Sequence, residues 1–125
     1  MTAFDDAPAP VAEYYRLLTS GVEEYGDGSA MAALLDPDLS FQGPLSGHMR
    51  GAARFVTSLT RFVESVRSID PSRLVVGDAQ VATHYIAAMP GGAVRFSEFF
   101  TLRDGLITEI HVHYDAADYV AKGGR

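Results

Sequence analysis

Apolar residues recur at helical spacing in the first half of the chain. The first group runs from position 11 to position 25 and contains Val11, Tyr14, Tyr15, Leu18, Val22 and Tyr25. This spacing places the six side chains on one face of a helix. Because Gly26 and Gly28 follow, the pattern predicts a helix from Val11 to Tyr25.

Two further helices are predicted before Pro71. Ser29 is a suitable cap for a short helix from Ala30 to Leu35, which would end before Asp36-Pro37. Between the two helices we expect a short strand over 39–42 and a glycine-rich loop over 43–51. The longer helix keeps its spacing through Ala52, Phe55, Val56, Leu59, Phe62, Val63 and Val66, and Asp70-Pro71 would close it.

After position 71 the apolar pattern becomes that of strands. We expect strands over 73–76, 81–89, 93–102 and 106–114, with turns at Gly77-Asp78, Pro90-Gly91-Gly92 and Asp104-Gly105. A capped helical turn over 115–120 follows. The order predicts an α+β fold, in which three N-terminal helices cover a curved antiparallel sheet.

Glu98 is the strongest chemical signal in the sequence. In a strand, alternate side chains share a face, so Glu98 lies on one face with Phe96, Phe100 and Leu102. A carboxylate among large apolar neighbours is costly unless it is protonated, paired or hydrogen-bonded. The alternatives are that Glu98 faces water, or that it is satisfied by a purely structural network.

The turn after the second strand gives Glu98 its expected neighbours. A two-residue turn at Gly91-Gly92 would pair Tyr85 with Glu98 and Thr83 with Phe100. Tyr85 could then donate to Glu98, or the two side chains could hold one substrate oxygen together. The structural alternative is a buried Tyr–Glu hydrogen bond that satisfies both groups.

The last strand can be placed in two registers. A tight turn at Asp104-Gly105 puts Glu98 opposite His111, whereas a bulge in the hairpin puts Val112 there. His111 and His113, two residues apart, could bind a metal, but no third ligand lies nearby in the sequence. We therefore predict no metal site.

Composition narrows the function. The 125 residues suit one domain, and the net charge of −6 comes without a basic stripe, which argues against nucleic acid and anionic membranes as partners. There is no cysteine and no apolar stretch long enough for a membrane span. The acidic, Pro/Ala-rich N-terminus is not typical of a signal peptide. We expect a cytoplasmic protein with a flexible arm over 1–10, one domain over 11–120 and a tail over 121–125.

The chain resembles the SnoaL-like branch of the nuclear transport factor 2-like superfamily. Besides the element order, the resemblance rests on Phe41-Gln42-Gly43-Pro44 followed by Gly51 and the helix of Phe55, on Phe100-Thr101-Leu102-Arg103-Asp104-Gly105-Leu106-Ile107, and on His113-Tyr114-Asp115. It implies a cone-shaped fold with one pocket between sheet and helices. The family includes ketosteroid isomerases, limonene-type epoxide hydrolases, polyketide cyclases and dehydratases, together with binding and scaffolding domains.

The resemblance also implies roles for particular positions. Ketosteroid isomerases carry a general-base aspartate where this chain has Gly43, whereas their protonated acid matches Glu98 in type. The family pattern favours the bulged register with Val112 inside. The water-holding residues of the epoxide hydrolases have no match at the corresponding positions, which are Phe41, Gly43, Tyr85, Ala87 and Val112.

These arguments predict a cofactor-independent acid–base enzyme of isomerase, cyclase or dehydratase type, acting on a small, largely apolar carbonyl compound. Glu98 and Tyr85 would be catalytic. The substrate-binding residues would be Tyr14, Phe41, Phe55, Leu59, Thr83, Phe96, Phe100, Ile110, Val112 and Tyr114. The alternatives are a small-molecule-binding protein with the same pocket, and a protein-interaction domain with a filled pocket, against which a cavity of about 300 Å³ or more would argue.

A homodimer is also expected. Its interface would be the outer sheet face, with His84, Phe99, His111 and His113. A phenylalanine in a row of polar groups suggests a surface that a second copy covers.

Overall fold

Six strands form one strongly curved sheet in the computed structural model, which describes residues 3–124. Its order is β2-β1-β6-β5-β4-β3, and neighbours are antiparallel except for β1 and β6, which run parallel. The strands are β1 (Leu35–Gly43), β2 (Gly47–Arg50), β3 (Ser68–Val76), β4 (Gln80–Met89), β5 (Gly92–Arg103) and β6 (Leu106–His113). The predicted four-strand meander is confirmed as β3 to β6.

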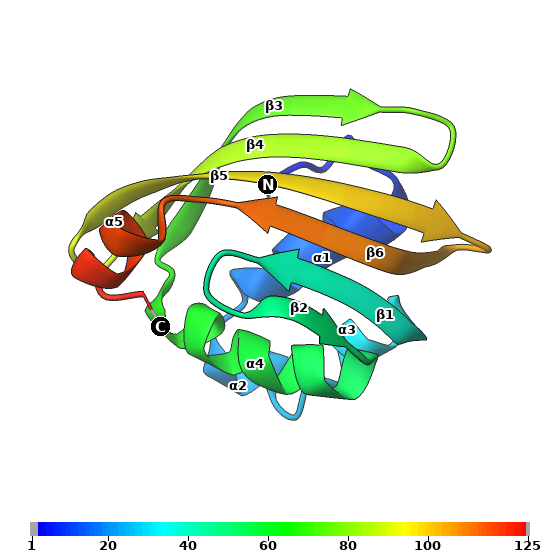
Figure 1. Cartoon of the computed structure of the whole chain (residues 1–125), viewed down its shortest axis with the longest axis horizontal. Coiled ribbons are helices and arrows are strands. Elements are labelled where there is room, and N and C mark those ends of the chain that lie inside the picture. The colour runs from blue at the N-terminus through cyan, green and yellow to red at the C-terminus, as the bar shows by residue number, and fades with distance from the viewer. Residues whose placement is uncertain (1–2, 125) are drawn as a thin grey trace.

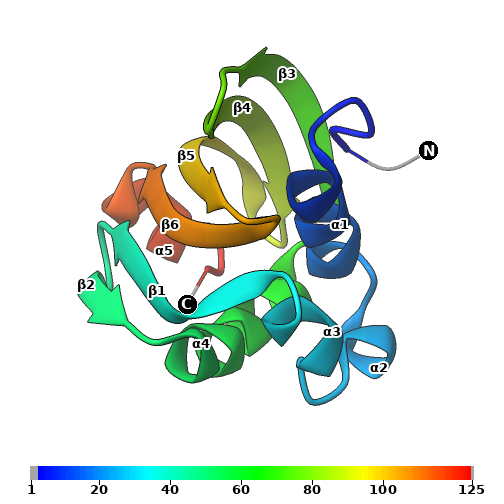
Figure 2. The ribbon, with the colours of Figure 1, turned by 90° about the vertical axis from the view of Figure 1, so that its right-hand side faces the viewer.

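The helices gather on the concave side and at one end of this sheet (Figure 1). They are α1 (Ala9–Leu18), α2 (Val22–Tyr25), α3 (Ser29–Ala32), α4 (Ala52–Ser65) and α5 (Ala116–Ala121). Figure 2 shows α1 lying inside the curve of the sheet, with α3 and α4 below it. The α+β class and the cone-shaped arrangement predicted from the sequence are therefore confirmed.

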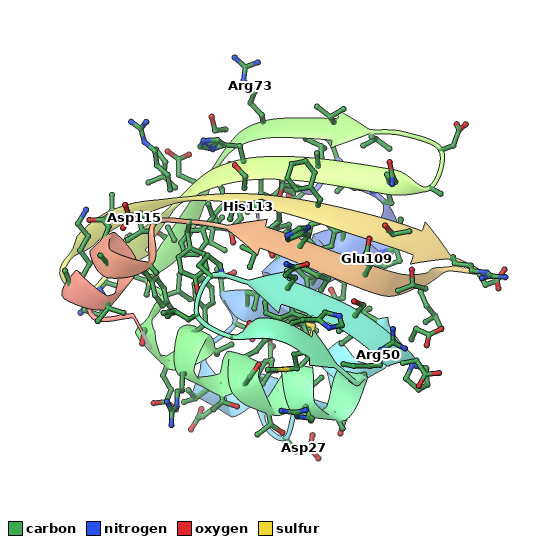
Figure 3. All side chains as sticks on the ribbon, viewed as in Figure 1. Asp27, Arg50, Arg73, Glu109, His113 and Asp115 are labelled. Atoms are coloured by element: carbon green, nitrogen blue, oxygen red, sulfur yellow. The ribbon has the colours of Figure 1, made fainter. Side chains whose placement is uncertain are left out.

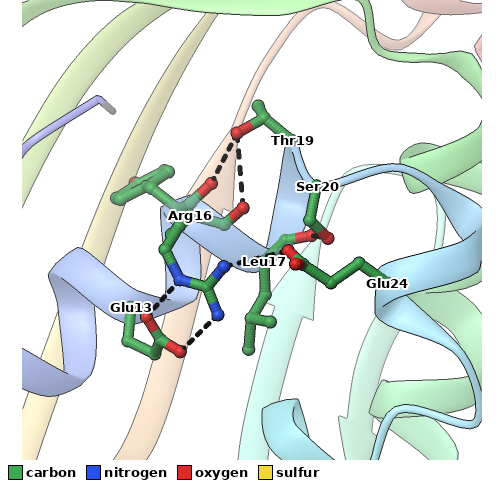
Figure 4. A network of polar contacts seen from close by, with 7 residues as sticks. Glu13, Arg16, Leu17, Thr19, Ser20 and Glu24 are labelled. Carbon is green, nitrogen blue, oxygen red and sulfur yellow. Dashed lines mark hydrogen bonds and ion pairs between the residues drawn. The ribbon is translucent and has the colours of Figure 1, made fainter. Parts of the chain in front are cut away.

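The first predicted helix is broken in two. Thr19 Oγ1 donates to the carbonyl oxygen of Tyr15 at 3.1 Å, and Ser20 Oγ donates to that of Leu17 at 2.7 Å (Figure 4). Side chains that bond back to helix carbonyls compete with the helix, and Gly21 follows with φ of +89°. α1 therefore ends at Leu18, although the apolar stripe continues through α2.

Two other predicted helix ends are wrong because Pro37 and Pro71 lie within strands and do not close helices. The predicted helix Ala30–Leu35 is only the short α3, and Leu35 opens β1, which contains Asp36-Pro37 at an irregular register. Asp70-Pro71 does not close α4 but lies at a bulge in the edge strand β3. Proline lacks an N–H donor, and edges and bulges are the places in a sheet where that loss is harmless. The expected loop over 43–51 contains β2.

The predicted β4–β5 register is wrong by two residues. Met89 pairs with Gly92, so the turn is Pro90-Gly91 and not Gly91-Gly92. Proline favours the second position of a turn because its φ is already fixed there. Thr83 consequently lies opposite Glu98, and Tyr85 lies opposite Phe96. A shift of two residues leaves every side chain on its predicted face.

The β5–β6 hairpin has the bulged register. Asp104 and Gly105 have φ of +54° and +78°, as a two-residue turn with left-handed residues requires. The register then shifts between Thr101 and Leu102, which brings Val112 opposite Glu98. Val112 lies inside and His111 outside, as the family resemblance favoured.

Both ends of the described chain contact the core. Phe4 is buried, and its ring centroid lies 4.7 Å from that of Tyr15, so it packs behind α1. Gly124 lies against the ring of Tyr119. The predicted arm and tail include residues 1–2 and 125, which lie outside the described residues. Within residues 3–124, no helix is long and apolar enough to cross a membrane.

Candidate active site

Glu98 is buried on the concave face of β5, with 2% of its surface exposed. Its Oε1 accepts hydrogen bonds from the hydroxyl groups of Tyr15 and Tyr85, each at 2.7 Å. Its Oε2 accepts a longer one, of 3.2 Å, from the hydroxyl group of Tyr14. Three tyrosines from two separate elements therefore converge on one carboxyl group.

The secondary structure explains this convergence. Tyr14 and Tyr15 are consecutive residues of α1, so their side chains diverge by about 100° and approach Glu98 from two sides. Their rings meet edge to face, with centroids 5.1 Å apart. Tyr85 reaches across from β4, where it is the diagonal neighbour of Glu98, because Thr83 is the directly opposite residue. The predicted Tyr85–Glu98 hydrogen bond thus forms despite the shifted register.

A second layer supports the network from behind. The hydroxyl groups of Tyr15 and Thr83 lie 2.7 Å apart, and both side chains are buried. Since Tyr15 donates its proton to Glu98, Thr83 donates to Tyr15. The chain Thr83–Tyr15–Glu98 fixes the position of Oε1.

An aromatic cavity of about 150 Å³ opens in front of Glu98. Buried residues form its floor, and the exposed Leu45, Ser46 and Ser58 lie at its mouth. Its lining consists of Tyr14, Leu18, Phe41, Leu45, Ser46, Phe55, Ser58, Leu59, Phe62, Tyr85, Phe96, Glu98, Val112, Tyr114 and Tyr119. Glu98 is the one carboxyl group among these described residues.

Burial controls the protonation of this site. Desolvation raises the pKa of Glu98 above its ordinary value of 4.5, although the hydrogen bonds from Tyr85, Tyr15 and Tyr14 oppose the shift. Desolvation and the nearby Glu98 also raise the pKa values of these tyrosines well above the usual value of 10.0. The tyrosines are therefore neutral donors, and the favoured state of Glu98 moves toward the neutral acid.

Most of the predicted binding residues line the cavity, but three do not. Thr83 lies behind Tyr15, and Phe100 and Ile110 are fully buried core residues.

Tyr15 was missed as a Glu98 partner because sequence spacing alone does not show how deep a helical tyrosine reaches. Other lining residues that the sequence analysis missed are Leu18, Leu45, Ser46, Ser58, Phe62 and Tyr119. Phe62, on the apolar stripe of α4, could have been found from helical spacing.

Position 43 borders the cavity but carries no base. A Cβ atom added to Gly43 would lie 2.9 Å from Cγ1 of Val112 and 3.4 Å from the ring of Phe41. Both neighbours line the cavity, so a side chain here would press into its wall. A first-strand aspartate would therefore require this wall to move.

The outer sheet face carries the residues predicted for a dimer. Phe99 is 50% exposed and pairs with His111 across the sheet, and its ring lies 5.9 Å from that of His113. Figure 3 shows Glu109 and His113 on the β6 face turned away from α1. The rings of His111 and His113 are 4.6 Å apart, but no group of three metal-binding side chains occurs among residues 3–124.

The SnoaL-like domain family matches residues 11–110, and the chain belongs to this family. Three solved structures illustrate its fold relatives. A proposed polyketide cyclase from Xanthomonas campestris is 22% identical, with a TM-score of 0.69 over 91% of this chain and 93% of that one. A ketosteroid isomerase-like protein from Catenulispora acidiphila, in complex with trimethylamine, is 15% identical, with a TM-score of 0.72 over 93% and 92%.

An LEH-like epoxide hydrolase from M. tuberculosis is the third, at 22% identity and a TM-score of 0.69 over 92% of this chain and 86% of that one. No curated protein matches the chain. The match to the family model shows that the chain is SnoaL-like, and the structural similarities support its nuclear transport factor 2-like fold.

The raised pKa of Glu98 predicts how stability depends on pH. Between 4.5 and the folded-state pKa, the folded protein binds more protons at Glu98 than the unfolded chain does, so stability falls as pH rises. Glu98→Gln keeps an acceptor for Tyr15 and Tyr85 and puts an amide donor beside Tyr14. It therefore resembles the neutral acid at every pH.

Urea unfolding from pH 4 to pH 8 would measure this effect. The unfolding free energy of the wild type, relative to Glu98→Gln, should decrease with rising pH by up to about 1.4 kcal/mol per unit. The other titrating groups cancel in the difference. A relative stability that increases with pH would mean that the folded-state pKa is lowered, and would contradict the assignment.

Tyr15→Phe tests the supporting layer. It removes a donor that favours ionised Glu98, so the pKa of Glu98 should rise further and the pH-dependent loss of stability should extend to higher pH. Tyr25→Phe is the matched control, because the Tyr25 hydroxyl group donates to the carbonyl oxygen of Val56 at 2.6 Å and is not among the tyrosines that donate to Glu98. Each variant should lose about 1 kcal/mol. An equal pH dependence in both variants would exclude a role for Tyr15 in setting the state of Glu98.

Proposed function

We propose that this protein is a cofactor-independent acid–base enzyme of isomerase, cyclase or dehydratase type, acting on a small, largely apolar carbonyl compound. The observation that carries the proposal is the placement of Glu98 at the wall of an aromatic cavity, where burial favours its neutral form. Membership of the SnoaL-like family, with isomerase-like, cyclase and hydrolase fold relatives, supports the same class.

Glu98 is the proposed proton donor. Neutral Glu98 gives its proton to the carbonyl oxygen of the substrate, and Tyr85 assists through its hydrogen bond to Oε1, which stabilises the carboxylate that this step leaves. The carboxylate formed in this step is stabilised by the hydroxyl groups of Tyr14, Tyr15 and Tyr85, which already point at its two oxygens. Because the described lining has no second carboxyl group or histidine, the same carboxylate then removes a proton from the carbon next to the protonated carbonyl group, which gives the enol and restores neutral Glu98.

A binding protein without turnover is the second candidate. The specific observation in its favour is that Glu98 already has three hydrogen-bond partners, as a structural network would provide. The neighbour that contains trimethylamine supports a pocket for small molecules in either case. A cavity of about 300 Å³ or more would have argued against a protein-interaction domain. The cavity here measures about 150 Å³, so ligand binding must test that hypothesis.

The outer sheet face is proposed to form a homodimer. Phe99 is half exposed on this face, beside His111 and His113. A second copy of the chain would cover its ring. Sedimentation should show a dimer at micromolar concentration, and Phe99→Glu should weaken it; a wild-type monomer would contradict the proposal.

The cytoplasmic location stays a prediction, which cell fractionation would test.

Glu98→Gln separates the enzyme from the binding protein. If Glu98 is the proton donor, turnover should fall by roughly 10²-fold or more while ligand affinity changes little, because size and one donor are kept. Tyr25→Phe, which loses a buried hydroxyl group outside the cavity, should retain turnover. Unchanged turnover in Glu98→Gln on an identified substrate would remove Glu98 from catalysis and favour the binding protein.

A further inference from the structure

A short segment before α1 folds back against the network around Glu98. Phe4 is the one large apolar side chain among residues 3–8, and it is buried. Its ring centroid lies 4.7 Å from that of Tyr15 and 6.1 Å from that of Tyr85. These are the two tyrosines that donate to Oε1 of Glu98, each at 2.7 Å. Phe4 therefore packs on both donors to the same carboxyl oxygen.

A groove at the surface adjoins the other side of the Phe4 ring. Neither Phe4 nor Tyr15 lines the aromatic cavity. Phe4 instead lines a second hollow, of about 290 Å³, which residues 4–6 form with residues 71–74 of β3. Figure 2 shows this segment between α1 and β3. Most residues around the hollow are exposed, so the ring of Phe4 separates a solvent-facing groove from Tyr15 and Tyr85.

The backbone at Phe4 has an unusual conformation. Its φ is +59°, in the left-handed region that bulky residues rarely adopt. Asp104 is the other described non-glycine residue with positive φ, and the tight β5–β6 turn requires it there. At Phe4 the chain turns so that the N–H of Ala7 donates to the Phe4 carbonyl oxygen at 3.0 Å. Because strained backbone persists only where its surroundings hold it, the burial of the ring stabilises this turn.

Exclusion of water from the groove side bears on the protonation of Glu98. Desolvation is the largest cause of the raised pKa of Glu98, and the titratable groups that face it are the three tyrosine hydroxyl groups. The charged side chains on the groove side are exposed, and are Asp5, Asp6 and Arg73. Water admitted past Phe4 would solvate Tyr15 and Tyr85, and would stabilise the ionised form of Glu98.

We propose that Phe4 is a positioning residue whose ring seals the hydrogen-bond network of Tyr15, Tyr85 and Glu98 against water from the surface groove. The segment before α1 is then part of the site, although it does not contact the cavity. The inference rests on the proposed function for the role of Glu98, and it adds the residue that keeps the rear of this network dry.

Exchange of the Tyr15 hydroxyl proton with water tests the seal directly. Tyr15 is fully buried and does not line the cavity, so its proton reports water that arrives past Phe4. In full-length Phe4→Ala, NMR should show this exchange at least about tenfold faster than in the wild type. The hydroxyl proton of Tyr25, which donates to the carbonyl oxygen of Val56, is the internal control. An unchanged rate at Tyr15, or an equal increase at Tyr25, overturns the proposal.

Two further substitutions at the same position separate the ring from the strained backbone. Glycine adopts a positive φ without strain, so Phe4→Gly should melt at a higher temperature than Phe4→Ala. Both variants lack the ring, so Tyr15 should exchange rapidly in both. Phe4→Leu keeps a large apolar side chain and should retain the slow exchange of the wild type. Exchange that follows the melting temperature instead of the side chain overturns the proposal. If Phe4→Ala does not fold, the glycine and leucine variants decide.

The carboxyl titration of Glu98 connects the seal to the proposed function. In Phe4→Ala and Phe4→Gly its midpoint should lie below that of the wild type, toward 4.5, because water offsets part of the desolvation. Met31→Ala, which truncates a fully buried side chain on α3 outside the cavity lining, should leave the midpoint unchanged.

The two measurements distinguish failure of the inference from failure of the proposed function. A midpoint that is unchanged or raised in both Phe4 variants overturns the inference and leaves the proposed function standing. A wild-type midpoint at or below 4.5 contradicts the proposed function. The exchange of Tyr15 then still decides whether Phe4 is the seal.

Discussion

The burial of one carboxyl group constrains the whole interior of this protein. Glu98 lies among aromatic rings with almost no exposed surface, and an ion in such a place is costly. Three tyrosine hydroxyl groups offset this cost by donating to both carboxyl oxygens. The position of α1 against the sheet, and of β4 against β5, must satisfy these bonds, so the helix and the sheet are held together by the site itself.

The local structure of α1 serves this constraint. Its last turn is closed by Thr19 and Ser20, and Arg16 bridges Glu13 and Glu24 by contacts of 2.6 and 2.9 Å at the surface (Figure 4). Exposed ion pairs of this kind contribute little stability. The anchoring of α1 therefore comes mainly from its buried face, where Tyr14 and Tyr15 meet Glu98 and Phe100.

Sequence patterns predicted the fold class, the strand phase and the inward direction of Glu98, because period-two alternation depends on local chemistry alone. They missed features that depend on tertiary contacts: the break after Leu18, the β4–β5 register and the reach of Tyr15. The register error came from taking Gly91-Gly92 as the turn, although the preceding Pro90 favours a turn one residue earlier. The cavity volume and the hydrogen bonds from Tyr14 and Tyr15 to Glu98 had no sequence signal, since they arise from residues far apart in the chain.

The protonation state of Glu98 is the central claim, and a ¹³C NMR titration of its side-chain carboxyl carbon tests it most directly. Comparison with Glu98→Gln identifies the resonance without ambiguity. The account predicts a titration midpoint clearly above 4.5, the ordinary value for glutamate, because burial outweighs the three tyrosine hydrogen bonds. A midpoint at or below 4.5 would show an ionised, structurally satisfied Glu98, and would contradict its role as a proton donor at neutral pH.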